Sequence, residues 1–229
     1  MNYKNLTIIG TSHIAKQSLE DVEKAIVGGK PDIVALELDR MRLYSLFKKP
    51  GRLRIYDIKR IGFKGFIFAL IGAWAEKKLG KMVGVAPGSE MKKAVRLAKK
   101  HKIKLALIDQ DIEITLKRFS QSLTWKEKWN FLVDIVKAFF VRKNVIEFDL
   151  TKVPSKKVIK NLVGKVKKRY PNVYNVLIEE RNHVMAENLK KIIEECPDKK
   201  ILAIIGAGHE EDILDLIKKP SITYSVKIG

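Results

Sequence analysis

LTIIGTSH, residues 6–13, is an apolar run of strand length that ends in a glycine, two small residues and a histidine. The same order returns near the other end of the chain as LAIIGAGH, residues 202–209. A continuous apolar run of this length is typical of a strand covered on both faces, and ligands of open α/β sheets bind beyond the carboxyl ends of such strands. We therefore expect two buried strands with His13 and His209 at one edge of a sheet.

Length and composition favour one α/β domain. The 229 residues, 46% of them hydrophobic, are enough for a sizeable core and too few for two typical large domains. The single cysteine, Cys196, excludes an intramolecular disulfide and favours a reducing, cytoplasmic location. The first residues lack the pattern of a signal peptide, and the longest apolar stretch, residues 66–75, is shorter than the roughly 20 residues of a membrane-spanning helix. We predict no transmembrane segment.

The net charge of +20 means that a partner carrying negative charge must be considered. Residues 117–169 hold fifteen Lys or Arg against four Asp or Glu, which is more than half of the excess. Three interpretations stay open: nucleic acid, an anionic membrane surface, or a solvated lysine-rich face of a heat-adapted protein. Zinc-finger spacing, RRM signatures and KH loops are all missing from the sequence, so we expect no specific nucleic-acid partner.

Strand-like and helical patterns alternate along the chain. Beyond the first strand, apolar runs predict strands at residues 32–39, 105–108 and 201–205, with an edge strand at 222–228. Strand, helix and strand in this order imply right-handed parallel crossovers. We predict an α/β fold whose central, largely parallel (mixed) sheet is flanked by helices.

The helical segments differ in character. Ser18 with Asp21, and Ser89 further on, predict helix N-termini. Residues 40–85 are helical in pattern, and their apolar centre suits the core, a homo-oligomer contact or a membrane surface. Residues 117–172 are predicted to form a basic helical insertion within a single domain that spans 1–229.

Polar residues follow several of the predicted strands. Glu37 and Asp109 lie at strand ends near the two histidines, and Arg181 lies on the apolar stripe of a helix predicted at 173–195. Two imidazoles and a carboxylate are a common ligand set for a catalytic divalent ion. A single histidine is more often a core or turn residue than a ligand, but the paired recurrence strengthens the metal interpretation.

Six ordered motifs carry a family resemblance: GTSH (10–13), ELDR (37–40), APGSEM (86–91), DQDIEITLKR (109–118), ERNHVMAENL (180–189) and GAGH (206–209). Together they resemble the TraB/PrgY pheromone-shutdown family. That family is similar to the Tiki proteins, proposed metal-dependent proteases with two GxxH motifs, and more distantly to erythromycin esterases and ChaN proteins. The resemblance implies an EreA/ChaN-like α/β fold and places His13, Glu37, Arg181 and His209 on the family's polar positions, with Glu90 as a further candidate.

The sequence departs from the family pattern in three respects. Gln110 replaces the usual arginine between two aspartates, which is expected to remove a charge from the site. Asp212 replaces a small residue three positions after the second histidine. Many TraB-like proteins continue into a C-terminal membrane region, so we expect either a soluble member or a trimmed domain of a membrane-associated protein.

Two functional hypotheses follow from the motifs and the resemblance. In the first, a peptidase-like hydrolase acts on a peptide or small-molecule substrate with a divalent ion (Mn, Co or Zn) held by His13, Glu37 and His209. Glu90 or Asp109 would accept a proton from water, and Arg181, with Arg118, would stabilise the oxyanion. In the second, the same cleft of a non-enzymatic regulator binds a peptide or pheromone at a membrane surface.

Overall fold

A computed structural model describes residues 1–12, 16–48, 59, 62, 66, 88–140 and 155–219. Within these residues the centre is a five-stranded sheet in the order β1-β2-β5-β3-β4. The parallel strands are β2 (Leu6–Thr11), β5 (Ile201–Gly206), β3 (Ile33–Leu36) and β4 (Lys104–Leu107), and β1 (Asn2–Tyr3) joins one edge antiparallel to β2. This arrangement confirms the predicted α/β fold with a largely parallel, mixed sheet. The likeness to erythromycin esterases and ChaN proteins stays a prediction.

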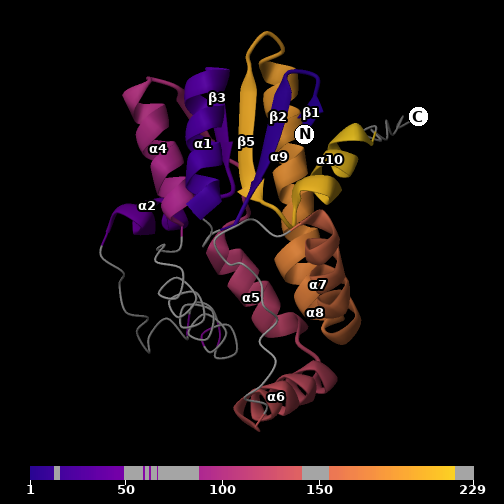
Figure 1. Cartoon of the computed structure of the whole chain (residues 1–229). Coiled ribbons are helices and arrows are strands. Elements are labelled where there is room, and N and C mark those ends of the chain that lie inside the picture. The colour runs from indigo at the N-terminus through magenta and orange to yellow at the C-terminus, as the bar shows by residue number, and fades with distance from the viewer. Residues whose placement is uncertain are drawn as a thin grey trace, which may run out of the picture.

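Helices cover both faces of the sheet (Figure 1). One face packs against α1 (Lys16–Gly29) and α4 (Ser89–Lys100), and the other against α9 (Glu180–Glu195) and α10 (Glu210–Lys218). Successive strand residues point to opposite faces, so each strand supplies both cores. In β5, for example, Ile201, Ala203 and Ile205 face α9 and α10, while Leu202 and Ile204 face α1 and α4. This two-sided burial explains why the strands are continuous apolar runs.

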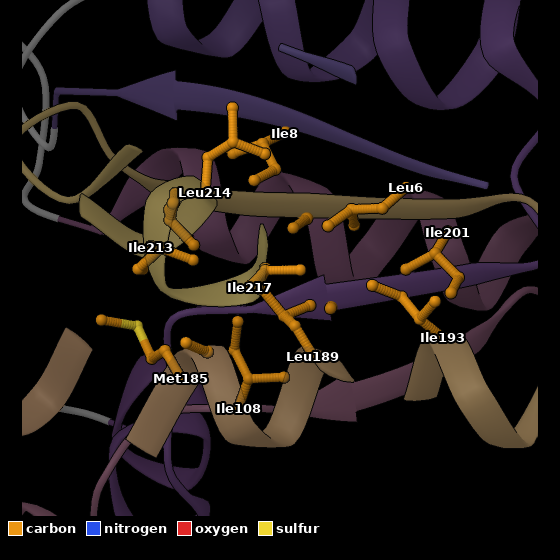
Figure 2. Packing of buried hydrophobic residues seen from close by; sticks show 14 of the residues in the cluster. Leu6, Ile8, Ile108, Met185, Leu189, Ile193, Ile201, Ile213, Leu214 and Ile217 are labelled. Atoms are coloured by element: carbon orange, nitrogen blue, oxygen red, sulfur yellow. The ribbon is translucent and has the colours of Figure 1, made fainter. Parts of the chain in front are cut away.

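The core on the α9 side is built from side chains that are far apart in sequence (Figure 2). Leu6 and Ile8 come from the start of the chain, Ile108 from the position just after β4, and Met185 and Leu189 from α9. All five are at most 1% exposed. This dense packing fixes α9 against the sheet and so determines where the first turn of α9 lies.

Two helix starts differ from the predictions. Helix α1 begins at Lys16, two residues before Ser18, whose side chain is buried and accepts a hydrogen bond from the Ser12 amide at 2.8 Å. Helix α4 begins at Ser89 and is preceded by Gly88, which has a left-handed φ of 74°. In both cases the predicted capping serine lies inside the helix.

The remaining helices that the structure describes in full lie beyond the carboxyl end of the sheet (Figure 1). They are α2 (Arg40–Phe47), α5 (Ile112–Ser122), α6 (Trp125–Phe140), α7 (Lys156–Arg169), α8 (Pro171–Tyr174) and the π-helical turn η1 (Asn175–Glu179), which leads into α9. That residues 117–172 form an insertion stays a prediction. The predicted edge strand at 222–228 and most of the apolar segment 63–74 lie outside the described residues. Among the described helices, none is long and apolar enough to cross a membrane.

Candidate functional site

Polar side chains gather at the carboxyl ends of the parallel strands. Strands β2 and β5 pair directly, with Gly10 opposite Ile205 and Thr11 opposite Gly206, so the two recurring sequence runs lie side by side. The chain leaves β3 at Glu37, whose amide donates to the carbonyl of Ile204 in β5 at 3.1 Å. Glu37 therefore lies at the end of both strands, as the parallel topology predicted.

A buried ion-pair cluster joins Glu37, Asp109 and Arg181. The Nη2 group of Arg181 donates to Oε1 of Glu37 and, at 2.6 Å, to Oδ2 of Asp109, while Nε reaches Oδ1 of Asp109 at 3.1 Å. The Asp109 side chain is 0% exposed and the Glu37 side chain 4%. Burial alone would lower the pKa of Arg181, but these two carboxylates raise it, so the guanidinium stays charged. Charges buried this deeply persist only because they are paired and hydrogen-bonded.

The helix that carries Arg181 has an irregular turn immediately before it. In η1 the backbone N–H groups bond to carbonyls five residues earlier instead of four. The Glu180 amide, for example, donates to the Asn175 carbonyl. The carbonyl of Leu177 accepts a hydrogen bond from Nη1 of Arg181 at 3.0 Å. Single π-helical turns inside α-helices change the register of the residues that follow. Here the turn precedes the arginine that points at the strand ends.

A second arginine, Arg42 of α2, extends the cluster. Its Nη2 group donates to Oδ2 of Asp109 at 2.7 Å and to the carbonyl of Gln110 at 3.0 Å, and its Nε donates to Asp39 at 2.5 Å. Asp39 also accepts from the amides of Met41 and Arg42 as the N-cap of α2. Asp109 is thus held by two guanidinium groups.

His209 lies against Glu37 on the other side of the cluster. Its Nδ1 is 2.5 Å from Oδ1 of Asn182, and its Nε2 is 3.5 Å from Oε1 of Glu37. The amide nitrogen of Asn182 donates to Asp212 at 3.2 Å, which identifies Oδ1 as the atom that faces the histidine. Because an amide oxygen only accepts, Nδ1 of His209 carries the hydrogen and Nε2 presents a lone pair to Glu37 in the neutral ring. Burial lowers the pKa of His209 despite the nearby Glu37 carboxylate, which favours this neutral form.

Two glycines allow this close packing. The Gly206 amide donates to Oε2 of Glu37 at 2.5 Å, and a Cβ at Gly206 would lie 3.1 Å from the same oxygen. A Cβ at Gly10 would lie 2.5 Å from the carboxyl carbon of Glu210 and 2.9 Å from the Cα of Ala207. A side chain at either of these strand ends would therefore press on neighbouring atoms.

The other predicted site residues have different surroundings. Arg118 of α5 is half exposed and donates to Glu180 at 2.6 and 3.2 Å, so it pairs with the residue next to Arg181 rather than with the buried carboxylates. Glu90 is buried in the first turn of α4, at the end of that helix nearest the carboxyl ends of the strands. His13 lies outside the described residues.

The structure shows the contacts of Gln110 and Asp212, the two residues that depart from the family pattern. Gln110 donates from its side chain to the hydroxyl of Thr115 at 3.1 Å, while Arg42 supplies the positive charge next to Asp109. Asp212 orients the Asn182 amide that faces His209.

Sequence reasoning missed Asp39, Arg42 and Asn182. Asp39 and Arg42 come shortly after a predicted strand, where helix-capping residues are common, and Asn182 adjoins Arg181 in the ERN motif. All three therefore had a local signal in the sequence. Within the described ranges, no group of three His, Cys, Asp or Glu side chains is arranged to hold a metal ion.

The fold and the cluster define an α/β protein with buried, paired charges at the carboxyl edge of a parallel sheet. The sequence pattern of the TraB/PrgY/gumN family matches residues 2–225, and the chain belongs to this family.

Known relatives agree with this assignment. The chain is 36% identical over 228 residues to an uncharacterized protein of Methanocaldococcus jannaschii, covering 96% of this chain and 55% of that protein. It is 21% and 20% identical to TraB domain-containing proteins of mouse (Mus musculus) and human (Homo sapiens), in each case covering 88% of this chain and 60% of the relative. The chain therefore spans little more than half the length of these relatives.

Proposed function

We propose that the chain is a divalent-metal-dependent, peptidase-like hydrolase with His13, Glu37 and His209 as the ligands. The observation that carries this proposal is the pair formed by His209 and Glu37. A neutral imidazole nitrogen with its lone pair faces a carboxylate oxygen at 3.5 Å, a distance too long for a good hydrogen bond. Two electron-rich atoms in this relation favour a cation between them.

The pair fits the dimensions of a metal site. Ligand bonds of about 2.0–2.2 Å at a tetrahedral angle place two ligand atoms about 3.4 Å apart. Imidazole and carboxylate suit Zn, Mn and Co. The hydrogen bond from Nδ1 to Asn182 is the outer-shell contact that fixes the tautomer of a ligating histidine. His13, two residues beyond Thr11 in the sequence, is the proposed third ligand.

The surrounding residues have distinct proposed roles. A bound divalent ion would lower the pKa of a water molecule and polarise a carbonyl. Arg181 directs four N–H groups to Glu37, Asp109 and Leu177, so we assign it to positioning Glu37 rather than to the oxyanion. Asp109 already accepts from two arginines, which favours Glu90 as the group that takes the proton from water.

Metal analysis and hydrolysis assays test the proposal. Protein purified without a histidine tag is loaded separately with Mn, Co and Zn, and bound metal is measured together with turnover of a peptide and ester panel. His13→Ala and His209→Ala should lose both metal and turnover. The other two histidines, His101 and His183, are exposed, so their alanine variants are matched controls and should retain both. No bound metal with any ion, or equal losses in the controls, would contradict the proposal.

The alternative, a non-enzymatic regulator that binds a peptide, uses the same strand ends. It predicts saturable peptide binding without product. Product analysis by mass spectrometry separates the two proposals, because only the hydrolase releases shortened peptides.

A further inference from the structure

Helix α6 presents two exposed tryptophans on one face. Trp125 is 83% exposed and Trp129 is 68% exposed. Residues four apart on a helix are neighbours on its surface, so the two indoles form one patch. Tryptophan is usually well buried, and an exposed apolar patch of this kind marks an interaction site more often than a single exposed residue does.

Contacts on the opposite face of α6 fix the direction in which the two tryptophans point. Glu127 and Thr124 form a reciprocal capping box at the start of α6, with side chain to amide distances of 3.1 and 3.3 Å. Glu127 also accepts from the Asn172 amide of α8 at 2.8 Å, and Asp134 binds Arg169 at the end of α7 at 2.5 Å. Figure 1 shows α6 at the end of the molecule away from the sheet. The tryptophan face therefore points outward.

One lysine lies beside the tryptophans, and further lysines are exposed on the helix next to α6. The Nζ of Lys128 lies 4.0 Å from the centre of the Trp125 ring. The contact between Asp134 and Arg169 holds the last turns of α7 next to α6. In these turns of α7, Lys165, Lys167 and Lys168 are exposed. Positive charge and exposed indoles thus occur together at this end of the molecule.

We propose that this α6–α7 surface binds an anionic lipid bilayer, with Trp125 and Trp129 at the headgroup level and the lysines on the headgroups. Indole is amphipathic and favours the membrane–water interface, and each basic residue near an anionic surface strengthens binding about fivefold. Single-stranded nucleic acid also combines aromatic and basic contacts, but in a groove that follows its backbone. Here the indoles lie exposed on the outward face of α6, at the end of the molecule away from the sheet (Figure 1).

Vesicle binding by the full chain tests this surface. We expect sedimentation with vesicles of phosphatidylcholine and phosphatidylglycerol, little with phosphatidylcholine alone, and weaker binding as salt rises. The double variant Trp125→Ala and Trp129→Ala should bind about tenfold more weakly, and Lys165→Glu with Lys168→Glu at least about 25-fold more weakly. Circular dichroism of each variant confirms that it is folded.

Matched substitutions elsewhere separate this surface from general charge and hydrophobicity. Tyr44→Ala removes an aromatic residue of α2 that is 58% exposed, and Lys99→Glu with Lys100→Glu reverses two exposed lysines at the far end of α4. These controls should bind vesicles like the unmodified chain.

Four outcomes of the vesicle and DNA binding assays would overturn the proposal. They are indifference to phosphatidylglycerol, equal loss in the control variants, binding retained when the tryptophans are removed, and binding of single-stranded DNA at physiological salt in place of vesicles. Self-association that disappears with Trp125→Ala and Trp129→Ala, without vesicle binding, would likewise assign the surface to a second copy of the chain.

Discussion

Arg181 is the residue on which the arrangement of the buried cluster depends. It is the shared donor for Glu37 and Asp109, whose carboxylates have side-chain exposures of only 4% and 0%. Removing one partner of a buried pair leaves the other charge without compensation, and this costs more than the pair contributes. The cluster therefore makes a strong stability prediction at one position.

Arg181→Met is expected to lower the free energy of unfolding by about 3–5 kcal/mol, because two buried carboxylates lose their cation. Urea unfolding followed by circular dichroism measures this loss. Arg118→Met is the matched control, since the ion pair of Arg118 with Glu180 is half exposed, and it should leave the midpoint almost unchanged. Equal midpoints for the two variants would show that the Arg181 contacts contribute little.

Gly206→Ala is expected to destabilise the protein by about 1–3 kcal/mol, since its Cβ would lie 3.1 Å from Oε2 of Glu37 and displace the carboxylate. Thermal unfolding measures the change. Gly164→Ala in α7 is the control, because nothing lies within 4 Å of a Cβ there, and replacing a helical glycine by alanine should stabilise by about 0.5–1 kcal/mol. The two substitutions should shift the midpoint in opposite directions, and a shift in the same direction would contradict the steric argument.

At the scale of the elements, the sheet was predictable because burial on both faces produces continuous apolar runs. The parallel topology also predicted that the residues after the strands would meet at one edge, and Glu37, Asp109 and His209 do so. Helix starts were less predictable: Ser18 has the local pattern of a cap but lies inside α1, where it binds Ser12. The pairing of Arg42 with Asp109, 67 positions apart, depends on how α2 packs, which no local pattern encodes.

Helix α6 is joined to α8 by one buried carboxylate, and this makes a prediction about pH. Burial alone would raise the pKa of Glu127, but hydrogen bonds from Asn172 and Thr124 lower it below 4.5. The folded state therefore holds the ionised form more strongly than the unfolded state does. The stabilisation is fully present above pH 4.5 and is lost as the pH falls through the lowered pKa.

Glu127→Gln should therefore lower the free energy of unfolding by about 1–2 kcal/mol at pH 7. The difference in this free energy between the variant and the unmodified chain should become smaller below pH 4.5. Thermal unfolding from pH 3 to pH 7 measures it. Glu23→Gln is the control, because Lys93 also lowers the pKa of Glu23 but this carboxylate lies on the surface. If the stability difference between Glu127→Gln and the unmodified chain does not change with pH, the fit of the Glu127 side chain, rather than its charge, stabilises the contact.

At the scale of the whole molecule, the site joins segments from both ends of the chain. Strands β2 and β5 pair although they are nearly two hundred residues apart, and Glu37, Asp109 and Arg181 come from three further segments. The cluster can thus form only when the sheet and α9 have assembled. Its buried charges are screened little by salt, whereas the net charge of +20 on the rest of the molecule is open to screening.

This difference determines how the stability of the whole chain should respond to ionic strength. Self-repulsion of a net charge of +20 destabilises the compact state, and salt screens it, which raises the unfolding temperature. Salt also weakens exposed ion pairs such as Lys167 with Glu179, but each of these contributes little. We therefore expect the unfolding temperature to rise between low and physiological sodium chloride concentrations. The variant Lys165→Glu with Lys168→Glu has a net charge four units lower, so its rise should be smaller. A falling unfolding temperature would mean that exposed ion pairs outweigh the repulsion.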